Sequence, residues 1–315
     1  MLHEHKLWVE KYRPKSLGEC ILPAHLKAVF QGFVDSDLVP NMTFGGKPGI
    51  GKTTTIKALC NQMDLDNFLV PCSENGNIDT LRTDIRGYAS TVSINGNRKV
   101  VILDEADGLT KVTQQALRTF IEEFSGNCSF VLTVNFVNQV IPALIDSRCP
   151  LIEFKPTKED KPRMAKEMHK RIETILKTEN IPYDNKVIAK LVTKYFPDFR
   201  ATLMQIQKYS ATGRIDDGIL ACLEDIPIKQ VIDALKNKNF ADTRKWVSNN
   251  IDNEPHRIYR QLFDACYEFL EPRSIPEFVL ILAEYLDQSS RSVDQEIVLL
   301  AFLTRLMASE DINFK

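Results

Sequence analysis

The chain has 315 residues, of which 43% are hydrophobic and 26% are charged, and its formal net charge is −2. This length allows two or three domains, and the composition is that of an ordinary globular protein. Because the net charge is close to zero, any contact with nucleic acid must come from a local basic patch rather than from bulk charge.

The cysteine pattern and the apolar runs point to a cytoplasmic protein. The seven cysteines include no C-x-x-C pair, which argues against a zinc module or a disulfide framework. Met1 to Lys6 do not resemble a signal peptide, and the longest apolar run, Ile297 to Leu303, is too short to span a bilayer. We therefore expect a soluble protein with reduced thiols.

The N-terminal part predicts a short segment followed by a helix. Leu7 to Pro14 mixes aromatic, charged and apolar residues, and we expect a surface arm anchored by Trp8 and Tyr12. Apolar residues at helical spacing then predict a helix over Ala24 to Val34.

A phosphate-binding pattern follows. Gly46 to Thr53 reads G-K-P-G-I-G-K-T and matches G-x-x-x-x-G-K-[ST] in full. Met42 to Phe44 can end a buried strand before it, and a helix can begin around Thr54 after it. The agreement between pattern and context disfavours a chance glycine-rich turn. The sequence therefore predicts that this chain binds a nucleoside triphosphate.

Each residue type in this loop suits that task. Gly49 and Gly51 allow the backbone to approach an anion closely, and backbone N–H groups at the helix start attract phosphate oxygens. Lys52 would reach the β- and γ-phosphates, and the Thr53 hydroxyl would ligate Mg²⁺.

A second strand and a basic helix are predicted next. Asn67 to Pro71 has strand character, and Ile78 to Ala89 predicts a helix on which Arg82 and Arg86 share one face. The residues alone leave two interpretations open, a solvated charged face or a binding face.

Two carboxylates follow the next predicted strand. Lys99 to Leu103 is apolar after its first residue, as in a parallel strand buried on both faces. Asp104 stands at the carboxyl end, where open α/β sheets place their ligands, and is expected to hold Mg²⁺. Glu105 is suited to orient and deprotonate an attacking water.

The remaining elements of this region complete the alternation of strands and helices. Thr113 to Phe124 predicts a helix, and Cys128 to Val134 predicts a buried strand followed by Asn135, which could contact the γ-phosphate or the water. Leu151 to Phe154 predicts the closing strand. This order over residues 40–155 implies a doubly wound parallel sheet, within a nucleotide-binding domain of residues 1–155.

Beyond this point the pattern is all-helical. Residues 156–226 show apolar stripes at helical spacing and are interpreted as a small helical domain. Residues 227–315 contain amphipathic segments near 228–236, 240–249, 255–270, 275–288 and 292–308 and no apparent catalytic group, so we interpret them as an assembly domain.

Several motifs together resemble those of the sliding-clamp loader ATPases, which are AAA+ proteins that include the small subunits of replication factor C. The motifs are Trp8 to Pro14, the P-loop, Asp104 to Asp107, Gln114 to Arg118 and Ser147 to Cys149. Two further runs, Glu19 to Pro23 and Phe196 to Arg200, resemble the large clamp-loader subunit of T-even-like phages. The resemblance implies an AAA+ domain, a lid domain and an all-helical collar, and host-cell cytoplasm as the location if the source is viral.

The resemblance also implies site residues. Asn135 matches the first sensor, Arg200 the second sensor, and Arg148 an arginine finger that acts on the ATP of a neighbouring subunit. The catalytic set is then Glu105, Asn135, Arg148 and Lys52. The residues implied in ATP binding are Val9, Glu10, Lys11, Tyr12, Ile21, Gly46, Gly49, Ile50, Gly51, Lys52, Thr53, Thr54 and Arg200, with Thr53 and Asp104 for Mg²⁺.

The family further implies a pentamer of several copies of this chain with one different subunit, which loads a ring-shaped clamp onto primer–template DNA with DNA-stimulated ATP hydrolysis. Arg82, Arg86 and Lys111 fall where relatives follow the DNA backbone, with Arg98 and Lys99 as alternatives. A helicase loader or another AAA+ remodelling ATPase is the alternative enzyme. An ATP-gated scaffold is the alternative of another class. ATPase activity that needs both primed DNA and a clamp would distinguish them.

Overall fold

The computed structural model describes residues 7–72, 78–91, 98–216, 228–250 and 255–315, except for the side chains at 78–82 and 255–256. The chain divides into two compact units, Met1–Leu220 and Ala221–Lys315. Among the described residues, no helix is long and apolar enough to cross a membrane.

A parallel sheet forms the centre of the first unit. Its strands are β1 (Met42–Gly45), β2 (Asn67–Pro71), β3 (Lys99–Asp104), β4 (Cys128–Val134) and β5 (Leu151–Glu153). They lie in the order β2-β3-β4-β1-β5, and every neighbouring pair is parallel. The predicted parallel sheet is confirmed, and the carboxyl ends of β1, β3 and β4 lie side by side at one edge.

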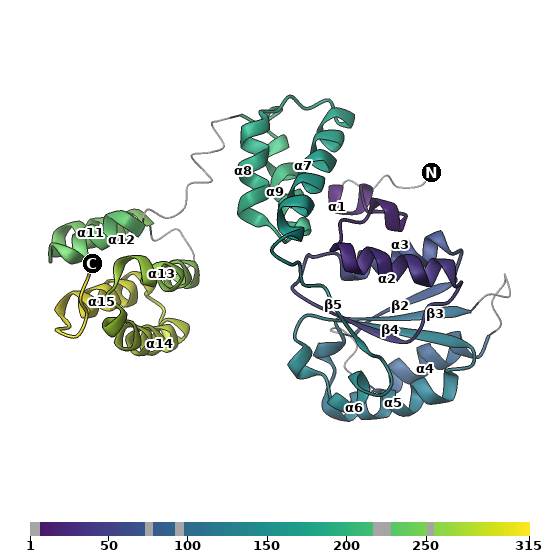
Figure 1. The fold of residues 1–315 in the computed structure, drawn as a ribbon. Helices are drawn as coiled ribbons and strands as arrows, with labels where there is room; N and C mark the ends of the chain where they lie inside the picture. The colour runs from purple at the N-terminus through teal and green to yellow at the C-terminus, as the bar shows by residue number, and fades with distance from the viewer. Residues whose placement is uncertain (1–6, 73–77, 92–97, 217–227, 251–254) are drawn as a thin grey trace. The chain divides into compact units, whose positions relative to one another are not determined.

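Helices cover both faces of this sheet (Figure 1). On one face lie α2 (Ala24–Asp35) and α3 (Lys52–Gln62), and on the other lie α4 (Ile78–Ala89), α5 (Lys111–Phe124) and α6 (Pro142–Ile145). Successive strand residues point to opposite faces, so Val100 and Ile102 belong to one hydrophobic core whereas Val101 and Leu103 belong to the other. This double burial explains the continuous apolar run that predicted β3.

Three helices of the first unit form the region that was predicted as a lid. They are α7 (Asp160–Thr178), α8 (Asn185–Tyr195) and α9 (Phe199–Ser210). Met164, Met168 and Ile172 bury one stripe of α7, at the spacing expected for a helix that packs on its neighbours.

The predicted N-terminal arm is a short helix rather than an irregular segment. It forms α1 (Trp8–Lys11), and a 3-10 turn, η1 (Leu17–Glu19), follows it. Trp8 is buried, with 6% of its surface exposed, and its backbone N–H donates to Gln207 Oε1 of α9 at 3.0 Å. Burial against α9 is what orders this segment, and that contact is invisible in the local sequence.

The second unit is helical in all its described elements. They are α11 (Ile228–Lys236), α12 (Phe240–Asn250), α13 (Pro255–Phe269), the 3-10 turn η4 (Pro272–Ser274), α14 (Ile275–Arg291) and α15 (Gln295–Ala308). Tyr259, Phe278 and Phe302 are fully buried at the centre of its core. The five predicted helical segments are therefore confirmed. The predicted boundary at 226/227 lies outside the described residues, as do Met1 to Lys6, and the domain limits stay a prediction.

Candidate active site

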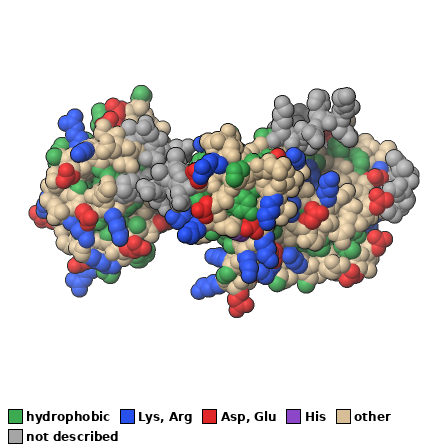
Figure 2. Space-filling model, turned by 90° about the horizontal axis from the view of Figure 1, so that it is seen from above, with side chains coloured by type: hydrophobic (Ala, Val, Ile, Leu, Met, Phe, Trp, Pro, Cys, Tyr) green, Lys and Arg blue, Asp and Glu red, His purple; other side chains and the backbone are tan. Residues whose placement is uncertain are grey.

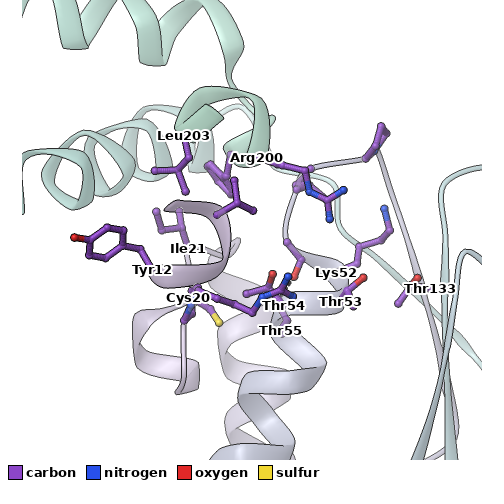
Figure 3. A pocket seen from close by; sticks show the side chains of 18 of the residues that line it. Tyr12, Cys20, Ile21, Lys52, Thr53, Thr54, Thr55, Thr133, Arg200 and Leu203 are labelled. Carbon is purple, nitrogen blue, oxygen red and sulfur yellow. Dashed lines mark hydrogen bonds between the residues drawn. The ribbon is translucent and has the colours of Figure 1, made fainter. Parts of the chain in front are cut away.

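A pocket lies where the P-loop, the ends of β3 and β4, the N-terminal segment and the lid helices meet, and we call it the P-loop pocket (Figure 3). The predicted site residues that line it are Val9, Tyr12, Ile21, Gly49, Ile50, Gly51, Lys52, Thr53, Thr54, Asp104, Glu105, Asn135 and Arg200. Segments far apart in the sequence are thus brought around one space.

The P-loop turns from β1 into α3 through two glycines with left-handed backbone conformations. Gly49 has φ 72° and Gly51 has φ 100°, and α3 begins at the next residue, Lys52. A side chain at Gly49 would also meet the lid, because a Cβ there would lie 1.8 Å from Asp198 Oδ1. The backbone N–H of Phe199 donates to Gly49 O at 3.0 Å. Glycine therefore permits both the turn and the close approach of α9.

Lys52 is the buried cation of the pocket, with 7% of its surface exposed. Its Nζ donates to Gly46 O at 2.7 Å, to Lys47 O at 3.0 Å and to Asn135 Oδ1 at 2.8 Å. Loss of hydration lowers the pKa of Lys52 to about 8, although Asp107, Asp104 and Glu105 act against the shift. The contact with Asn135 connects the P-loop directly to the end of β4.

Asp104 lies at the end of β3 and accepts two short hydrogen bonds. Thr53 Oγ1 and Thr133 Oγ1 each donate to Asp104 Oδ1 at 2.6 Å. Carboxylate and hydroxyl oxygens side by side are ligands that suit Mg²⁺. The donor set therefore fits the predicted metal. The sequence analysis did not select Thr133, whose only signal was its place at the end of a strand beside Asp104.

Glu105 follows directly and has an unusual backbone conformation. Its φ of 57° lies in the left-handed region, and its backbone N–H donates to Thr133 Oγ1 at 3.1 Å. A non-glycine residue in this region costs on the order of 1 kcal/mol and is enriched at functional sites. The side chain is exposed at the pocket, where a general base could meet a water molecule.

Two polar residues hold the loop that carries Asn135, and the sequence analysis assigned no role to either. Asp107 Oδ2 accepts from the backbone N–H groups of Asn135 at 3.1 Å and Phe136 at 3.0 Å. Gln114 Oε1 accepts from Ile141 N at 2.8 Å, and its Nε2 donates to two backbone carbonyls. Asp107 belongs to the motif Asp104 to Asp107 and Gln114 to the motif Gln114 to Arg118, and this membership was the only sign in the sequence that they have a role.

The lid contributes Arg200 to the pocket. It lies in the first turn of α9, after Asp198, which caps the helix by accepting from Ala201 N at 2.8 Å. In Figure 3 the side chains of Arg200 and Lys52 extend into the same part of the pocket from different elements. This nearness of two cations also contributes to the lowered pKa of Lys52.

The opposite end of the pocket is more apolar. Figure 3 shows Tyr12, Ile21 and Leu203 on the side away from Lys52 and Arg200, and Val9 and Met168 also line the pocket. Tyr12 Oη donates to Glu179 Oε1 at 2.5 Å, and burial with this neighbouring carboxylate raises the pKa of Tyr12. An apolar pocket end next to a cationic P-loop is complementary to a nucleotide, which has an aromatic base at one end and anionic phosphates at the other.

Other predicted residues do not line the pocket. Glu10 pairs with Arg13, and Lys11 Nζ contacts Glu179 Oε1 at 2.9 Å. Gly46 does not line the pocket either, but its carbonyl oxygen accepts a hydrogen bond from Lys52 Nζ. The roles of these three residues stay predictions.

Arg148 lies outside the pocket, next to α5. Its Nε donates to Glu122 Oε1 at 2.6 Å, and its Nη2 contacts the same carboxylate. Arg118 Nε lies 3.9 Å from Glu122 Oε1 as well. The structure therefore does not bring Arg148 to the phosphate loop of its own chain.

The basic residues predicted for DNA contact lie on the α4 and α5 face. Arg86 Nη2 pairs with Glu123 Oε1 at 3.1 Å, and its guanidinium lies 5.5 Å from the centre of the Phe120 ring. Lys111 is exposed at the first position of α5, whereas the side chain of Arg82 is outside the described part. Figure 2 is seen from above the view of Figure 1 and therefore presents the side of the first unit away from α4 and α5, where acidic and basic side chains are interspersed.

The two alternative basic residues differ in exposure, since Arg98 is exposed whereas Lys99 is buried. Arg98 Nε donates to Ser129 Oγ at 2.8 Å. Lys99 is 4% exposed, and its Nζ donates to Tyr88 O at 3.0 Å and Thr91 O at 2.6 Å. Burial disfavours Lys99 as a primary phosphate contact, whereas the exposed Arg98 stays a candidate.

Comparisons with known proteins agree with this geometry. Residues 42–157 match the family model described as ATPase family associated with various cellular activities (AAA), and residues 160–221 match the sliding-clamp-loader large subunit, AAA+ ATPase lid domain. The sliding-clamp-loader large subunit of Escherichia phage RB69 is 43% identical over 84% of this chain and 83% of its own. That of Enterobacteria phage T4 is 37% identical over 87% of each.

More distant proteins share the fold. The replication factor C small subunit of Archaeoglobus fulgidus is 32% identical over 78% of each chain. Among solved structures, the Thermotoga maritima RuvB Holliday junction branch migration motor superposes with a TM-score of 0.54 over 79% of this chain and 80% of its own, at 18% identity.

Proposed function

Because the chain belongs to the sliding-clamp-loader large-subunit family of AAA+ ATPases, we propose that it uses ATP to load a ring-shaped sliding clamp onto primer–template DNA during replication. The observation that carries the proposal is the arrangement of Lys52, Asp104 and Glu105 around one pocket. A chain with this pocket and this family membership has the parts that an ATP-driven loader needs.

ATP would bind along the pocket with its base between the N-terminal segment and the lid and with its phosphates on the P-loop. The backbone N–H groups at the start of α3 and the Lys52 ammonium would hold the phosphates. Lys52 must then exchange its bonds to Gly46 O and Asn135 for phosphate oxygens. Thr53 and Asp104 would hold Mg²⁺, which neutralises charge on the triphosphate.

Hydrolysis needs a base and a group that orients the water. The Glu105 carboxylate would accept a proton from the attacking water. The water oxygen bonds to the γ-phosphorus while the bond from that phosphorus to the β,γ-bridging oxygen breaks. Asn135 would orient that water or the γ-phosphate. The left-handed backbone of Glu105 supports its role as the base, because strained conformations are enriched at functional sites. The hydrogen bond from its backbone N–H to Thr133 holds this conformation.

We assign Arg148 to the γ-phosphate of a neighbouring subunit. Its place outside the pocket of its own chain supports this assignment, since an arginine finger can be supplied by another chain. The active assembly would therefore contain several copies of this chain. A pentamer completed by one different subunit is the arrangement that the family suggests.

The experiment that tests the function is ATPase stimulation of the purified assembly. We expect turnover to rise when primed DNA and a sliding clamp are added together, and to rise less with either alone. Stimulation by a helicase instead would support a helicase loader. Turnover that responds to none of these ligands would support a scaffold with incidental hydrolysis.

A further inference from the structure

Arg171 is a half-buried cation of the P-loop pocket, and among the described residues no ion pair within 4.0 Å involves it, although the Glu19 carboxylate acts on it from farther away. It lies on α7, three residues after Met168, so that both line the pocket from the same helix face. Loss of hydration lowers the pKa of its guanidinium. A charge that loses part of its hydration needs hydrogen bonds to compensate for the loss, so the hydrogen-bond partners of Arg171 indicate its role.

The hydrogen-bond partners of Arg171 are two backbone carbonyls of the N-terminal segment. Nη2 donates to Tyr12 O at 2.7 Å, and Nη1 donates to Glu19 O at 3.0 Å. Tyr12, Glu19 and Cys20 all line the pocket, and Figure 3 shows Tyr12 and Cys20 on its apolar side. One rigid guanidinium thus fixes both ends of the stretch 12–19 to the lid.

The same stretch is fixed from the other side by α3. Gln62 Oε1 accepts from Leu17 N at 2.9 Å, and Asn61 Nδ2 donates to Lys15 O at 2.8 Å. The wall of the apolar end therefore lies between the phosphate-binding helix and the lid. Of these anchoring residues, Arg171 is the one that itself lines the pocket.

We propose that Arg171 is the positioning residue of the base-binding end of the pocket, where it sets the shape of the wall that receives the purine of the bound nucleoside triphosphate. The inference rests on the proposed nucleotide binding and adds a residue that acts on the base rather than on the phosphates. Lysine cannot replace Arg171 here, because the planar guanidinium donates from two nitrogens to two separate carbonyls, whereas the lysine ammonium is a single compact group.

The test compares triphosphate ligands that carry a nucleobase with one that does not. Binding of ATP, GTP and inorganic tripolyphosphate to the full-length chain is measured by calorimetry. For Arg171→Ala we expect about a tenfold loss of ATP affinity, since two charge-assisted hydrogen bonds are removed. The preference for ATP over GTP should also fall. Tripolyphosphate affinity should stay within about twofold of wild type, because its contacts are on the P-loop.

Arg163→Ala is the matched control. Arg163 lies on the same helix and donates through Nη2 to Leu22 O at 2.7 Å, but it does not line the pocket. We expect it to leave the ATP-to-tripolyphosphate affinity ratio unchanged. Arg171→Lys keeps the charge and should still lower that ratio, and it decides the question if Arg171→Ala does not fold.

Three outcomes would overturn the proposal. The first is an unchanged ATP affinity in folded Arg171→Ala or Arg171→Lys. The second is an equal loss for ATP and tripolyphosphate, which indicates a general defect of the fold. The third is the same ratio change in Arg163→Ala, which indicates loosening of the lid. Failure of wild type to bind either ligand would instead contradict the proposed nucleotide binding.

Discussion

Arg148 Nε donates to Glu122 Oε1 at 2.6 Å, so the proposed arginine finger is held by the α5 helix of its own chain. The Arg148 side chain has 30% of its surface exposed and the Glu122 side chain 47%, and an ion pair this exposed contributes at most about 1 kcal/mol. The pair can therefore orient Arg148 without preventing its transfer to a neighbouring phosphate. The free energy that an arginine finger contributes to the transition state of hydrolysis is far larger than that of the ion pair with Glu122.

Mixing two inactive variants should restore ATPase activity. Arg148→Ala removes the finger and Lys52→Ala removes the phosphate-binding cation, so each variant assembled alone should turn over slowly. In a mixed assembly an intact P-loop can meet an intact finger. Loss of an arginine finger lowers turnover by roughly 10³-fold or more, so partial recovery is easy to measure in a steady-state phosphate-release assay.

Glu122→Gln is the comparison that separates orientation from chemistry. It removes one charge of the pair and leaves Arg148 in place, and we expect turnover within about fivefold of wild type, in keeping with the small worth of exposed pairs. Substantial DNA-stimulated hydrolysis by a dilute chain shown to be monomeric would contradict the assignment of Arg148 to a neighbour.

Glu105→Gln should separate ATP binding from hydrolysis. The amide keeps the size of the side chain but cannot accept the proton of the attacking water, so turnover should fall by about 10²-fold or more. ATP affinity should change little, because the contacts proposed for the phosphates come from the P-loop. Calorimetric binding and single-turnover hydrolysis measure the two steps separately.

Glu153→Gln provides the control for that substitution. Glu153 also ends a strand of the sheet, β5, and is exposed, but it does not line the P-loop pocket. Its turnover should equal that of wild type. A normal hydrolysis rate in Glu105→Gln would mean that another group is the base.

Most of the fold was predictable because its signals are local. Buried parallel strands are short continuous apolar runs, and β3 and β4 show them clearly. The helices of the second unit repeat apolar residues at helical spacing. The N-terminal helix α1 was not predicted, since four residues have little helical preference of their own and are ordered by burial of Trp8 against α9.

The site was predictable where a pattern requires one residue type, as at Lys52, Thr53 and Asp104. Thr133 was missed because its contact with Asp104 depends on the register between β3 and β4. Arg171 was missed because its hydrogen bonds go to backbone carbonyls far away in the sequence, such as that of Glu19, which is separated from it by 152 residues. Backbone partners leave no pattern in a sequence.

ATP binding should take up a proton at alkaline pH through Lys52. Its pKa in the free protein is lowered to about 8, so the amine is largely neutral above that pH. Bound phosphates favour the ammonium and raise the pKa in the complex. Between these two pKa values the complex holds one proton more than the free protein. Affinity for ATP should therefore fall as pH rises above about 8.

Calorimetry in buffers of different ionisation enthalpy measures this uptake. At about pH 8.5 the binding enthalpy should depend on the buffer, whereas at about pH 6.5 Lys52 is protonated in both states and contributes no uptake. Lys52→Arg, which stays charged throughout, should lose the alkaline uptake. Equal uptake by wild type and Lys52→Arg would assign the proton to another group.

The last prediction concerns the α4 and α5 face and DNA. If Arg82 and Arg86 contact phosphates, Arg82→Ala/Arg86→Ala should weaken primed-DNA binding equally for all base sequences. Each lost phosphate contact should flatten the log–log salt dependence by about one unit, because one fewer counterion is released. ATP affinity without DNA should not change, since Arg86 does not line the P-loop pocket.

Glu123→Gln sharpens this test because Glu123 is the partner of Arg86, at 3.1 Å. Removing its charge should free the guanidinium and strengthen DNA binding by a few-fold, a change opposite in sign to that of the double variant. DNA affinity is measured at several salt concentrations with clamp and a non-hydrolysable ATP analogue present. If the double variant keeps the affinity and slope of wild type, Arg86 serves only its pair with Glu123, and the DNA path must be sought near Lys111 or Arg98.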